Sequence, residues 1–243
     1  GPGRSYRFHV PDLSPLPAER VELPTSEAHH GRDVLRVRAG QEIELFDGQG
    51  TLARARVHGV SRHSVSVAVE RIDHLERGSP RIHLAFAVPK GKRLDWLLAK
   101  ATELGAASLQ AVVFERSVAG DHSLGASKRR RWAQHCVAAA KQCGLNFLPE
   151  LREHASLADY LRDQEELSLL GDLGPEASPL RETLAGADVE EVALLVGPEG
   201  GLTPEEQEAA IAAGMVPVRL GRTVLRVETA ALALLSGTMA LLD

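Results

Sequence analysis

Apolar and polar residues follow one pattern up to residue 75 and another from residue 81 onward. In the first part they alternate, or nearly alternate, with the period of two that is typical of strands with one buried face. We expect such strands over residues 6–10, 42–46, 53–57 and 64–69. Asp47-Gly48-Gln49-Gly50 separates two of them and predicts a hairpin turn. The pattern indicates a β-rich sheet or small barrel, with one short helix over Glu27–Val34 that Ser26 would cap.

The second pattern alternates short apolar segments with segments of helical period, and residues 73–80 form the expected linker between the two parts. We expect strands over 81–88, 109–114, 167–170, 192–196 and 216–220, and helices over 94–104, 128–142, 157–166, 204–213 and 229–242. Ser127 is the expected cap of the second of these helices. Strands that alternate with helices indicate parallel crossovers. The predicted fold class is therefore α/β, with a mostly parallel sheet in a domain over residues 76–243 and a separate β-rich domain over residues 1–75.

A glycine-rich turn follows the strand expected at residues 192–196. Leu194-Leu195-Val196 leads into Gly197-Pro198-Glu199-Gly200-Gly201, and Thr203-Pro204-Glu205-Glu206 then opens a helix. Glycine admits positive φ and leaves no Cβ between a ligand and the backbone. Ligands of open α/β sheets bind at the carboxyl ends of strands, where this turn lies. On the glycines alone, a ligand-binding turn and an ordinary tight turn are equally good interpretations.

The turn lacks the residues of the common phosphate-binding loops. A Walker loop ends in Gly-Lys-Ser/Thr and a dinucleotide fingerprint needs G-x-G-x-x-G, and the turn has neither. The earlier segment Pro89-Lys90-Gly91-Lys92-Arg93 also lacks the first Walker glycine. The sequence therefore disfavours ATP hydrolysis.

Charge is distributed unevenly along a chain whose formal net charge is −5. Residues 76–149 carry 12 Lys and Arg against 5 Asp and Glu, whereas residues 150–243 carry 6 against 18. Phosphate contact depends on such local basic patches rather than on the total charge. The basic middle is therefore a candidate RNA-binding region, with solvated helix faces as the alternative. Four successive basic residues, Lys128 to Arg131, would encircle a helix instead of forming one face, so the patch is only moderately specific.

Other features narrow the class of protein. We find no apolar segment long enough to cross a bilayer and no signal peptide, so we expect a cytoplasmic protein without a membrane partner. Cys136 and Cys143 lie on one predicted helix and form neither a CxxC motif nor a plausible disulfide. Without a Cys/His cluster at ligand spacing, no metal site is expected. Gly1-Pro2-Gly3 is typical of a remnant of tag cleavage and is excluded from fold reasoning.

Several separated motifs resemble one known family. The C-terminal ones are the glycine turn at 197–201, Leu220-Gly221, Val224-Leu225-Arg226 and Glu228-Thr229-Ala230. The others are Tyr6-Arg7-Phe8, His30 with Val34-Leu35-Arg36 and Gly40, Leu45-Phe46-Asp47-Gly48, Lys92-Arg93, Lys100-Ala101-Thr102-Glu103-Leu104-Gly105, Arg116-Ser117 and Gln142-Cys143-Gly144. Taken in their order along the chain, these motifs resemble those of the SPOUT class of methyltransferases. Within that class they resemble the ribosomal RNA small subunit methyltransferase E family, which methylates N3 of a uridine in 16S ribosomal RNA.

The resemblance implies a catalytic domain with a deep C-terminal trefoil knot, in which S-adenosylmethionine lies among three loops. It also implies an N-terminal PUA-like barrel that helps to capture RNA, and a homodimer with the cofactor site near the subunit interface. Chain topology rules argue against knots in general, so the residue pattern by itself does not predict one. Leu145 departs from the family pattern, which commonly has an arginine directly after Gln-Cys-Gly, and this puts one RNA contact in doubt.

The resemblance assigns roles to individual residues. Glycines would let the backbone approach the cofactor and leucines would supply apolar walls, with core packing as the ordinary alternative for the leucines. The cofactor-binding candidates are Leu195, Gly197, Pro198, Glu199, Gly200, Gly201, Leu220, Gly221, Leu225, Arg226, Glu228, Thr229 and Ala230. Thr229 is expected to open the last helix, as its cap or facing the cofactor.

The catalytic candidates are Arg226 and Glu199. Uracil N3 must lose a proton to become nucleophilic, and a fixed cation beside a uracil carbonyl eases that loss. Arg226 supplies such a cation but cannot be the base, because a guanidinium stays protonated. A structural Arg226 tied to Glu228 is an equally weighted alternative. Glu199 either accepts hydrogen bonds across the pocket, pairs with Arg226 of the partner subunit, or only orders its loop.

Candidate RNA contacts combine basic and polar residues from both parts of the chain. They are Arg7, His30, Arg36, Lys90, Lys92, Arg93, Arg116, Lys128, Arg129, Arg130 and Gln142, each with surface solvation as the alternative. Two rival functions remain at this point. One is an RNA-binding protein that keeps the fold without catalysis, and the other is an α/β enzyme that uses another nucleotide such as NAD.

Overall fold

The computed structural model describes residues 5–14, 16, 18–117, 124–165 and 167–242, and the chain divides into two compact units. The first unit comprises Gly1–Arg77 and Ala140–Leu148, and the second comprises Gly78–Ala139 and Pro149–Asp243. The division near residue 77 lies within the expected linker. Residues 140–148 also belong to the first unit, which differs from the domain ranges expected from the sequence. They join it through contacts with residues that are far away along the chain.

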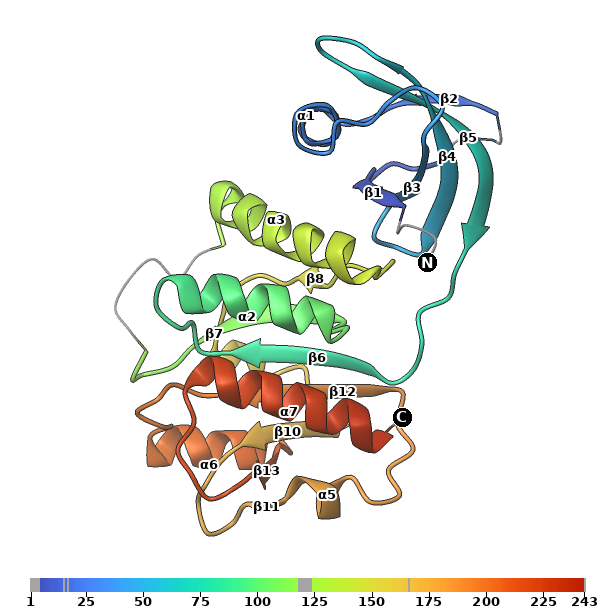
Figure 1. The fold of residues 1–243 in the computed structure, drawn as a ribbon. Coiled ribbons are helices and arrows are strands. Elements are labelled where there is room, and N and C mark those ends of the chain that lie inside the picture. The colour runs from blue at the N-terminus through green and yellow to red at the C-terminus, as the bar shows by residue number, and fades with distance from the viewer. Residues whose placement is uncertain (1–4, 15, 17, 118–123, 166, 243) are drawn as a thin grey trace. The chain divides into compact units, whose positions relative to one another are not determined.

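The first unit is built on a five-stranded sheet (Figure 1). Its strands, in the spatial order β1-β3-β4-β5-β2, are β1 (Tyr6–His9), β3 (Glu42–Phe46), β4 (Thr51–Val60), β5 (Val65–His74) and β2 (Arg20–Glu22). β1 pairs parallel to β3 and the other pairs are antiparallel. The four strands expected from alternation are present. β2 was not expected, because three residues carry too little pattern.

The turn between β3 and β4 requires glycine. Gly50 has φ +107°, and a Cβ built there would lie 2.5 Å from the Leu75 carbonyl oxygen. Alternate residues of the flanking strands, such as Ile43, Leu45 and Ala53, are buried in the core of the unit. The turn chemistry and the alternation therefore fix this hairpin together, as expected.

The short helical segment of the first unit differs in detail from its prediction. It consists of α1 (Thr25–His29) followed directly by a π-helical turn, η1 (His30–Val34). Pro24 occupies the N-cap of α1 without a side-chain hydrogen bond, and Ser26 lies inside the helix. The prediction that Ser26 caps this helix is therefore wrong, because the helix begins one residue before it.

The end of α3 (Ala126–Cys143) and the residues after it belong to the first unit. Nη1 of Arg7 donates hydrogen bonds of 3.1 Å to the carbonyl oxygens of Ala140 and Leu145. Lys141 Nζ lies 2.8 Å from Glu27 Oε2. These contacts join segments more than a hundred residues apart in sequence, which local patterns cannot reveal.

The second unit contains an eight-stranded sheet whose pairs are all parallel. Along the sheet the order is β11 (Ser178–Pro179), β13 (Val216–Arg219), β10 (Leu167–Gly171), β12 (Glu191–Val196), β6 (Arg81–Phe86), β7 (Ser108–Val113) and β8 (Glu150–Leu151), with β9 (Ala155–Ser156) also paired to β7. The five strands expected here are present. The chain passes from β10 to β12 and then returns past β10 to β13, so the carboxyl ends of these three strands adjoin.

Helices accompany this sheet (Figure 1). Besides α3 they are α2 (Lys92–Glu103), α4 (Leu157–Tyr160), α5 (Leu180–Thr183), α6 (Pro204–Ala212) and α7 (Val227–Leu242). α7 packs on β6, β12 and α2, with Ala231, Leu234 and Leu235 fully buried. This packing encloses the apolar residues of β12, the strand that leads into the glycine turn.

Three expectations about these helices are wrong. The helix expected over 157–166 ends at Tyr160, with Leu161 as its C-cap. Ser127 lies inside α3, which begins at Ala126. Thr229 is the third residue of α7 rather than its opening residue, because the helix begins at Val227.

Candidate functional site

A cavity of about 320 Å³ lies at the carboxyl ends of β10, β12 and β13, and three loops form its walls. It is lined by Gly171, Asp172, Leu173, Val196, Gly197, Pro198, Glu199, Gly200, Gly201, Leu202, Val218, Leu220, Gly221, Thr223, Val224, Leu225, Val227 and Ala230. In open α/β sheets this edge is the usual place for a ligand. The glycine turn therefore borders a cavity, which favours the ligand-binding interpretation of its glycines.

Local geometry explains the residues of the glycine turn. A Cβ at Gly197 would lie 2.3 Å from Leu202 Cδ1, so a larger residue there would displace the Leu202 side chain, and Gly201 has φ +73°. Thr203 and Glu206 form the expected capping box at the start of α6: the Thr203 hydroxyl accepts from the Glu206 amide at 3.2 Å, and Glu206 Oε2 accepts from the Thr203 amide at 2.9 Å. The helix start thus fixes the far end of the turn.

Arg116 holds the turn from the segment after β7. Its Nη1 donates to the carbonyl oxygen of Gly200 at 2.7 Å and approaches that of Leu202 at 3.5 Å. The Glu115 amide donates to Glu206 Oε1 at 2.7 Å. Arg116 was expected to contact phosphate; its Nη1 bonds within the protein while the residue stays exposed, so the phosphate contact stays a prediction.

Two acidic residues near the cavity converge on one arginine of α2. Nη1 of Arg93 lies 2.7 Å from Glu199 Oε1 and 3.6 Å from Glu228 Oε2. From the sequence, Glu199 was expected to pair with Arg226 of the partner subunit, to accept hydrogen bonds across the pocket or to order its loop, and Glu228 was the expected partner of a structural Arg226. In the structure both carboxylates pair with Arg93.

Most, but not all, of the cofactor candidates line the cavity. The lining includes Gly197, Pro198, Glu199, Gly200, Gly201, Leu220, Gly221, Leu225 and Ala230. Leu195 is fully buried in β12, Glu228 is buried at the start of α7, and Arg226 and Thr229 are exposed beside the cavity, so these four do not line it. Arg226 lies between the lining residues Leu225 and Val227.

Sequence reasoning missed the wall that follows β10. Asp172 is fixed there, because its Oδ2 accepts from Gln207 Nε2 at 2.9 Å and its Oδ1 accepts from the Leu173 amide at 2.8 Å. The strand expected at 167–170 could have indicated this wall, because in a parallel sheet its carboxyl end lies near that of a neighbouring strand. The apolar side chain of Val224 is 78% exposed at the cavity.

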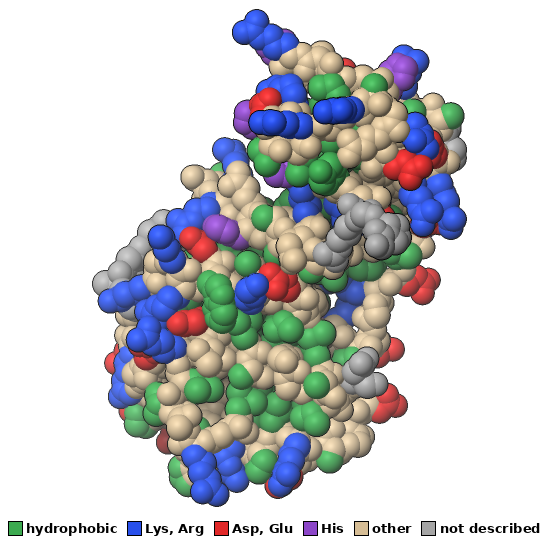
Figure 2. All heavy atoms as spheres, in the orientation of Figure 1, with side chains coloured by type: hydrophobic (Ala, Val, Ile, Leu, Met, Phe, Trp, Pro, Cys, Tyr) green, Lys and Arg blue, Asp and Glu red, His purple; other side chains and the backbone are tan. Residues whose placement is uncertain are grey.

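The candidate RNA contacts differ in how accessible they are. Lys90, Lys92, Arg130, Arg36 and Gln142 are exposed, while His30 and Lys128 are half-buried. Figure 2 shows basic side chains gathered over α2 and the start of α3. Arg129 donates to the Leu151 carbonyl oxygen at 2.5 Å and to Glu153, so part of its bonding capacity is already used.

Arg7 is a correction to the predicted RNA contacts. Its side chain is only 5% exposed, its Nε lies 3.3 Å from Glu44 Oε2, and its guanidinium stacks 4.5 Å from the centre of the Phe46 ring. Together with its bonds to Ala140 and Leu145, these contacts leave no open face for a phosphate. Arg7 ties the first unit together internally.

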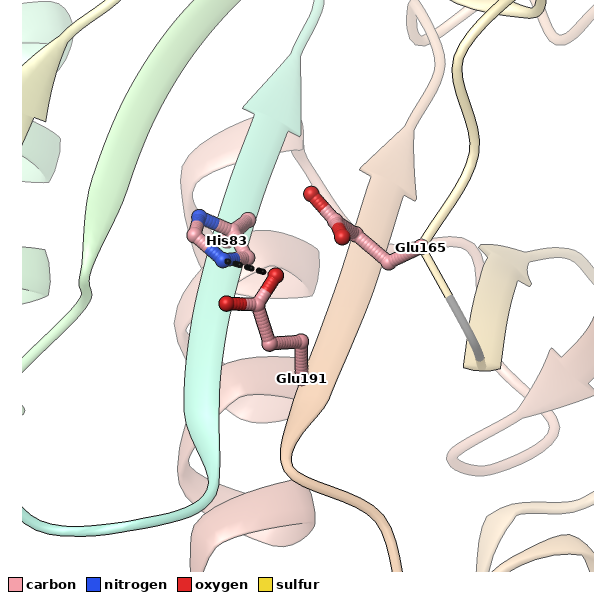
Figure 3. A group of neighbouring side chains, drawn as sticks. All are labelled: His83, Glu165 and Glu191. Carbon is pink, nitrogen blue, oxygen red and sulfur yellow. Dashed lines mark ion pairs between the residues drawn. The ribbon is translucent and has the colours of Figure 1, made fainter.

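A second group of titratable residues consists of His83 on β6, Glu191 at the start of β12 and Glu165 in the loop before β10 (Figure 3). Their potential ligand atoms lie within 4.8 Å of one another, beside a cavity of about 220 Å³. His83 Nδ1 lies 2.8 Å from Ser108 Oγ, and its Nε2 is 3.6 Å from Glu191 Oε2. The spacing rule that predicted no metal site could not detect this group, because its members come from separate segments.

The charges around this group favour a shared proton over a bound cation. Arg81 pairs with Glu191, and Arg152 Nη1 lies 3.7 Å from Glu165 Oε1, so two guanidinium groups already balance two carboxylates. Burial, together with the hydrogen bond to Glu191, raises the pKa of Glu165, while the same hydrogen bond lowers the pKa of Glu191. Burial also lowers the pKa of His83.

Two further findings bear on the class of protein. Burial raises the pKa of the Cys136 thiol to about 11, which keeps it protonated, and within the described part of the chain neither Cys136 nor Cys143 forms a disulfide. Across the described ranges, no helix combines the length and the apolar character needed to cross a membrane.

Comparison with known proteins places this architecture. A family model described as an RNA methyltransferase domain matches residues 77–239, and one described as an RNA methyltransferase PUA domain matches residues 23–70. The chain is 33% identical to the ribosomal RNA small subunit methyltransferase E of Mycobacterium bovis, over 92% of this chain and 87% of the relative. It is 31% identical to the protein of that name from Bacillus subtilis, over 90% of this chain and 89% of the relative.

Solved structures of methyltransferases are also similar to this chain. Ribosomal RNA small subunit methyltransferase E from Neisseria gonorrhoeae, bound to S-adenosyl methionine, is 30% identical, with a TM-score of 0.87 over 98% of each chain. A Legionella pneumophila protein in complex with the cofactor SAM is 33% identical, with a TM-score of 0.89 over 98% of each chain.

Proposed function

We propose that this chain, which belongs to the ribosomal RNA small subunit methyltransferase E family of RNA methyltransferases, transfers a methyl group from S-adenosylmethionine to N3 of a uridine in 16S ribosomal RNA. One observation carries the proposal: a cavity at the ends of three adjacent parallel strands is walled by the glycine turn at 197–201 and the loop at 220–225. The relatives that bind the cofactor share this fold over almost the whole chain.

The residues of the cavity fit the proposed cofactor. At about 320 Å³ it falls in the size range of small-molecule sites, which is roughly 300–1,000 Å³. A Cβ built at Gly201 or Gly221 would meet no atom within 4 Å, so the backbone is open to a ligand at both positions. Val218, Leu220 and Leu225 offer apolar contacts for a flat ring, and neighbouring backbone groups offer hydrogen bonds for its edge and for a ribose.

When bound, the cofactor would supply an electrophilic methyl group: the deprotonated uracil N3 would attack the methyl carbon in line, the bond from that carbon to the sulfonium sulfur would break, and the neutral thioether would leave. The chain therefore has to hold donor and acceptor in line and to ease the loss of the uracil N3 proton. Arg226 is the residue we assign to the second task, because it is exposed and lies between two residues of the cavity wall. Its fixed positive charge would stabilise the uracil anion. The exposed basic residues of α2 and α3 would hold the phosphates.

We extend the proposal to the assembly and the topology. After β12 the chain returns past β10 to β13, which pairs with β10 on the side away from β12, an order that supports the trefoil knot implied by the resemblance. Trp96 on α2 and Leu241 on α7 are 49% and 48% exposed, and Figure 2 shows apolar side chains over these helices. Such a surface supports a homodimer, which light scattering of the purified chain would detect. We place the enzyme in the cytoplasm, with its ribosomal substrate.

The test is equilibrium binding of S-adenosylmethionine to the wild-type chain and to Gly221→Val. Gly221 lacks the positive φ that a β-branched residue would resist, so the new side chain fills the cavity without straining the backbone. Gly78→Val is the matched control, because Gly78 is exposed, has free space and lies outside the cavity. We expect wild type and control to bind alike and Gly221→Val to lose at least tenfold in affinity. Equal binding by all three would refute the site.

The same titration with NAD addresses the enzyme that uses another nucleotide. We expect no saturable NAD binding. The other rival, an RNA-binding protein without catalysis, is distinguished by an assay of methyl transfer: the proposed enzyme transfers the methyl group and the rival does not.

A further inference from the structure

Arg93 joins two walls of the cavity that are distant in sequence. It is the second residue of α2, Glu199 is part of the glycine turn, and Glu228 is the second residue of α7. The hydrogen bond from Arg93 Nη1 to Glu199 Oε1 is 2.7 Å long, and Glu228 Oε2 lies 3.6 Å from the same nitrogen. One guanidinium therefore bridges the turn and the start of the helix that carries Val227 and Ala230, both cavity residues.

The two carboxylates depend on Arg93 to different degrees. The Glu199 side chain is 51% exposed, so solvent screens its ion pair and loosens it. The Glu228 side chain is 9% exposed, and its Oε2 is buried with no hydrogen-bond partner among the described residues. Arg93 is thus the cation beside a carboxylate that water reaches poorly, at a helix N-terminus that also favours negative charge.

This arrangement argues against the expected role of Arg93 as a phosphate contact. A phosphate that approached the guanidinium would meet two carboxylates around a single positive charge, and the local charge would repel it. The neighbouring Lys92 is exposed and keeps its place among the candidates.

We infer that Arg93 is a positioning residue of the cofactor site: it holds Glu199, and with it the glycine turn, against the N-terminus of α7. The inference rests on the proposed function of the cavity. Without Arg93, the turn loses its anchor on α7, and the cavity must be reordered each time the cofactor binds. Binding of S-adenosylmethionine weakens, while the chemistry of the bound state changes little.

The experiment measures equilibrium binding of S-adenosylmethionine to Arg93→Met, Glu199→Gln and the double variant, with kcat for methyl transfer at saturating cofactor. We expect a roughly tenfold weaker affinity for Arg93→Met, a smaller loss for Glu199→Gln, and a double variant no weaker than Arg93→Met, because both changes break the same contact. Arg93→Lys should recover part of the loss. We expect kcat of Arg93→Met at saturating cofactor to stay within about threefold of wild type.

The matched control is Arg162→Met, since Arg162 makes an exposed ion pair of 2.9 Å with Asp159 and lies outside the cavity. If Arg93→Met fails to fold, Arg93→Met/Glu228→Gln removes the buried charge together with its counterion and is measured against Glu228→Gln alone. Cofactor binding by this double variant that is weaker than binding by Glu228→Gln supports the positioning role. Binding equal to Glu228→Gln overturns it, because Arg93 would then only balance Glu228.

The two proposals fail separately. A wild-type chain that does not bind S-adenosylmethionine refutes the proposed function. A wild-type chain that binds it, together with an Arg93→Met variant of equal affinity, refutes the positioning role alone.

Discussion

Arg7 donates a hydrogen bond of 3.1 Å to the carbonyl oxygen of Leu145, which lies 138 positions further along the chain. Leu145 was the residue at which the sequence departed from its family pattern, and it raised doubt about an RNA contact. The structure shows what this position supplies: a backbone acceptor, which does not depend on the side chain. The segment 140–148 is part of the first unit through this bond and the one to Ala140.

The stability of the first unit should depend strongly on Arg7. Arg7→Met keeps most of the side-chain volume but leaves two carbonyl oxygens and the Glu44 carboxylate without their donor. We expect a loss of about 2–4 kcal/mol in the free energy of unfolding, measured by urea titration. Arg20→Met is the control, because Arg20 is exposed on the edge strand β2 and should change stability by less than about 0.5 kcal/mol. Equal stability of the two variants would contradict the internal role of Arg7.

The proposed role of Arg226 separates catalysis from cofactor binding. Arg226→Ala removes a cation beside the cavity without removing a lining residue, so we expect kcat for methyl transfer to fall by roughly ten- to a hundredfold. The affinity for S-adenosylmethionine should stay within about twofold. Arg226→Lys, which keeps the charge, should retain more activity than Arg226→Ala. Full activity of Arg226→Ala would remove this residue from the mechanism.

The basic residues of α2 and α3 should act through phosphate contacts. Lys92 and Arg130 are exposed, and we expect Lys92→Ala and Arg130→Ala each to weaken binding of small-subunit RNA and to reduce the salt slope by about one. Cofactor affinity should be unaffected and serves as the internal control. An unchanged salt slope for both variants would assign RNA binding to another surface.

His83 should make stability depend on pH in the mildly acidic range. Burial and the Arg152 and Arg81 charges lower the pKa of His83 below 6.5, against the attraction of Glu191 and Glu150. The folded state therefore prefers neutral His83, and this contribution to stability is present above about pH 6.5 and is lost as the pH falls toward the lowered folded pKa.

His83→Asn tests this directly, because its amide keeps a donor toward Ser108 Oγ and cannot titrate. We expect the unfolding free energy of the variant to fall less steeply than that of wild type between pH 6.5 and more acidic values. Parallel curves would show that His83 does not contribute to the acid sensitivity.

Local signals predicted much of the second unit. The apolar segment of β12, the glycines after it and the capping box of Thr203 and Glu206 each depend on residues within a few positions, and all three are found as expected. The same reasoning predicted the wrong length for α4. The helical spacing of apolar residues continues beyond Tyr160, but the chain leaves the helix there to reach β10. A short helix has little propensity to resist such a tertiary demand.

The site was predictable in part. The glycine turn could be identified from its strand, glycines and helix start, and the other lining candidates from the family resemblance, whereas Arg93 and Arg116 bond to partners 106 and 84 positions away. Their sequence context, basic residues at the ends of expected elements, is the same for a phosphate contact and for an internal ion pair. Only the fold shows which carboxylate or carbonyl group faces each arginine.

The central claim is methylation of uridine N3, and methyl transfer measures it most directly. The wild-type chain is incubated with S-adenosylmethionine labelled in its methyl group and with small ribosomal subunits from a strain that lacks the modification, and the labelled nucleotide is then mapped and identified. The account predicts one labelled position per subunit, identified as 3-methyluridine. Binding of the subunits without transfer, or a label at another atom or base, would contradict it.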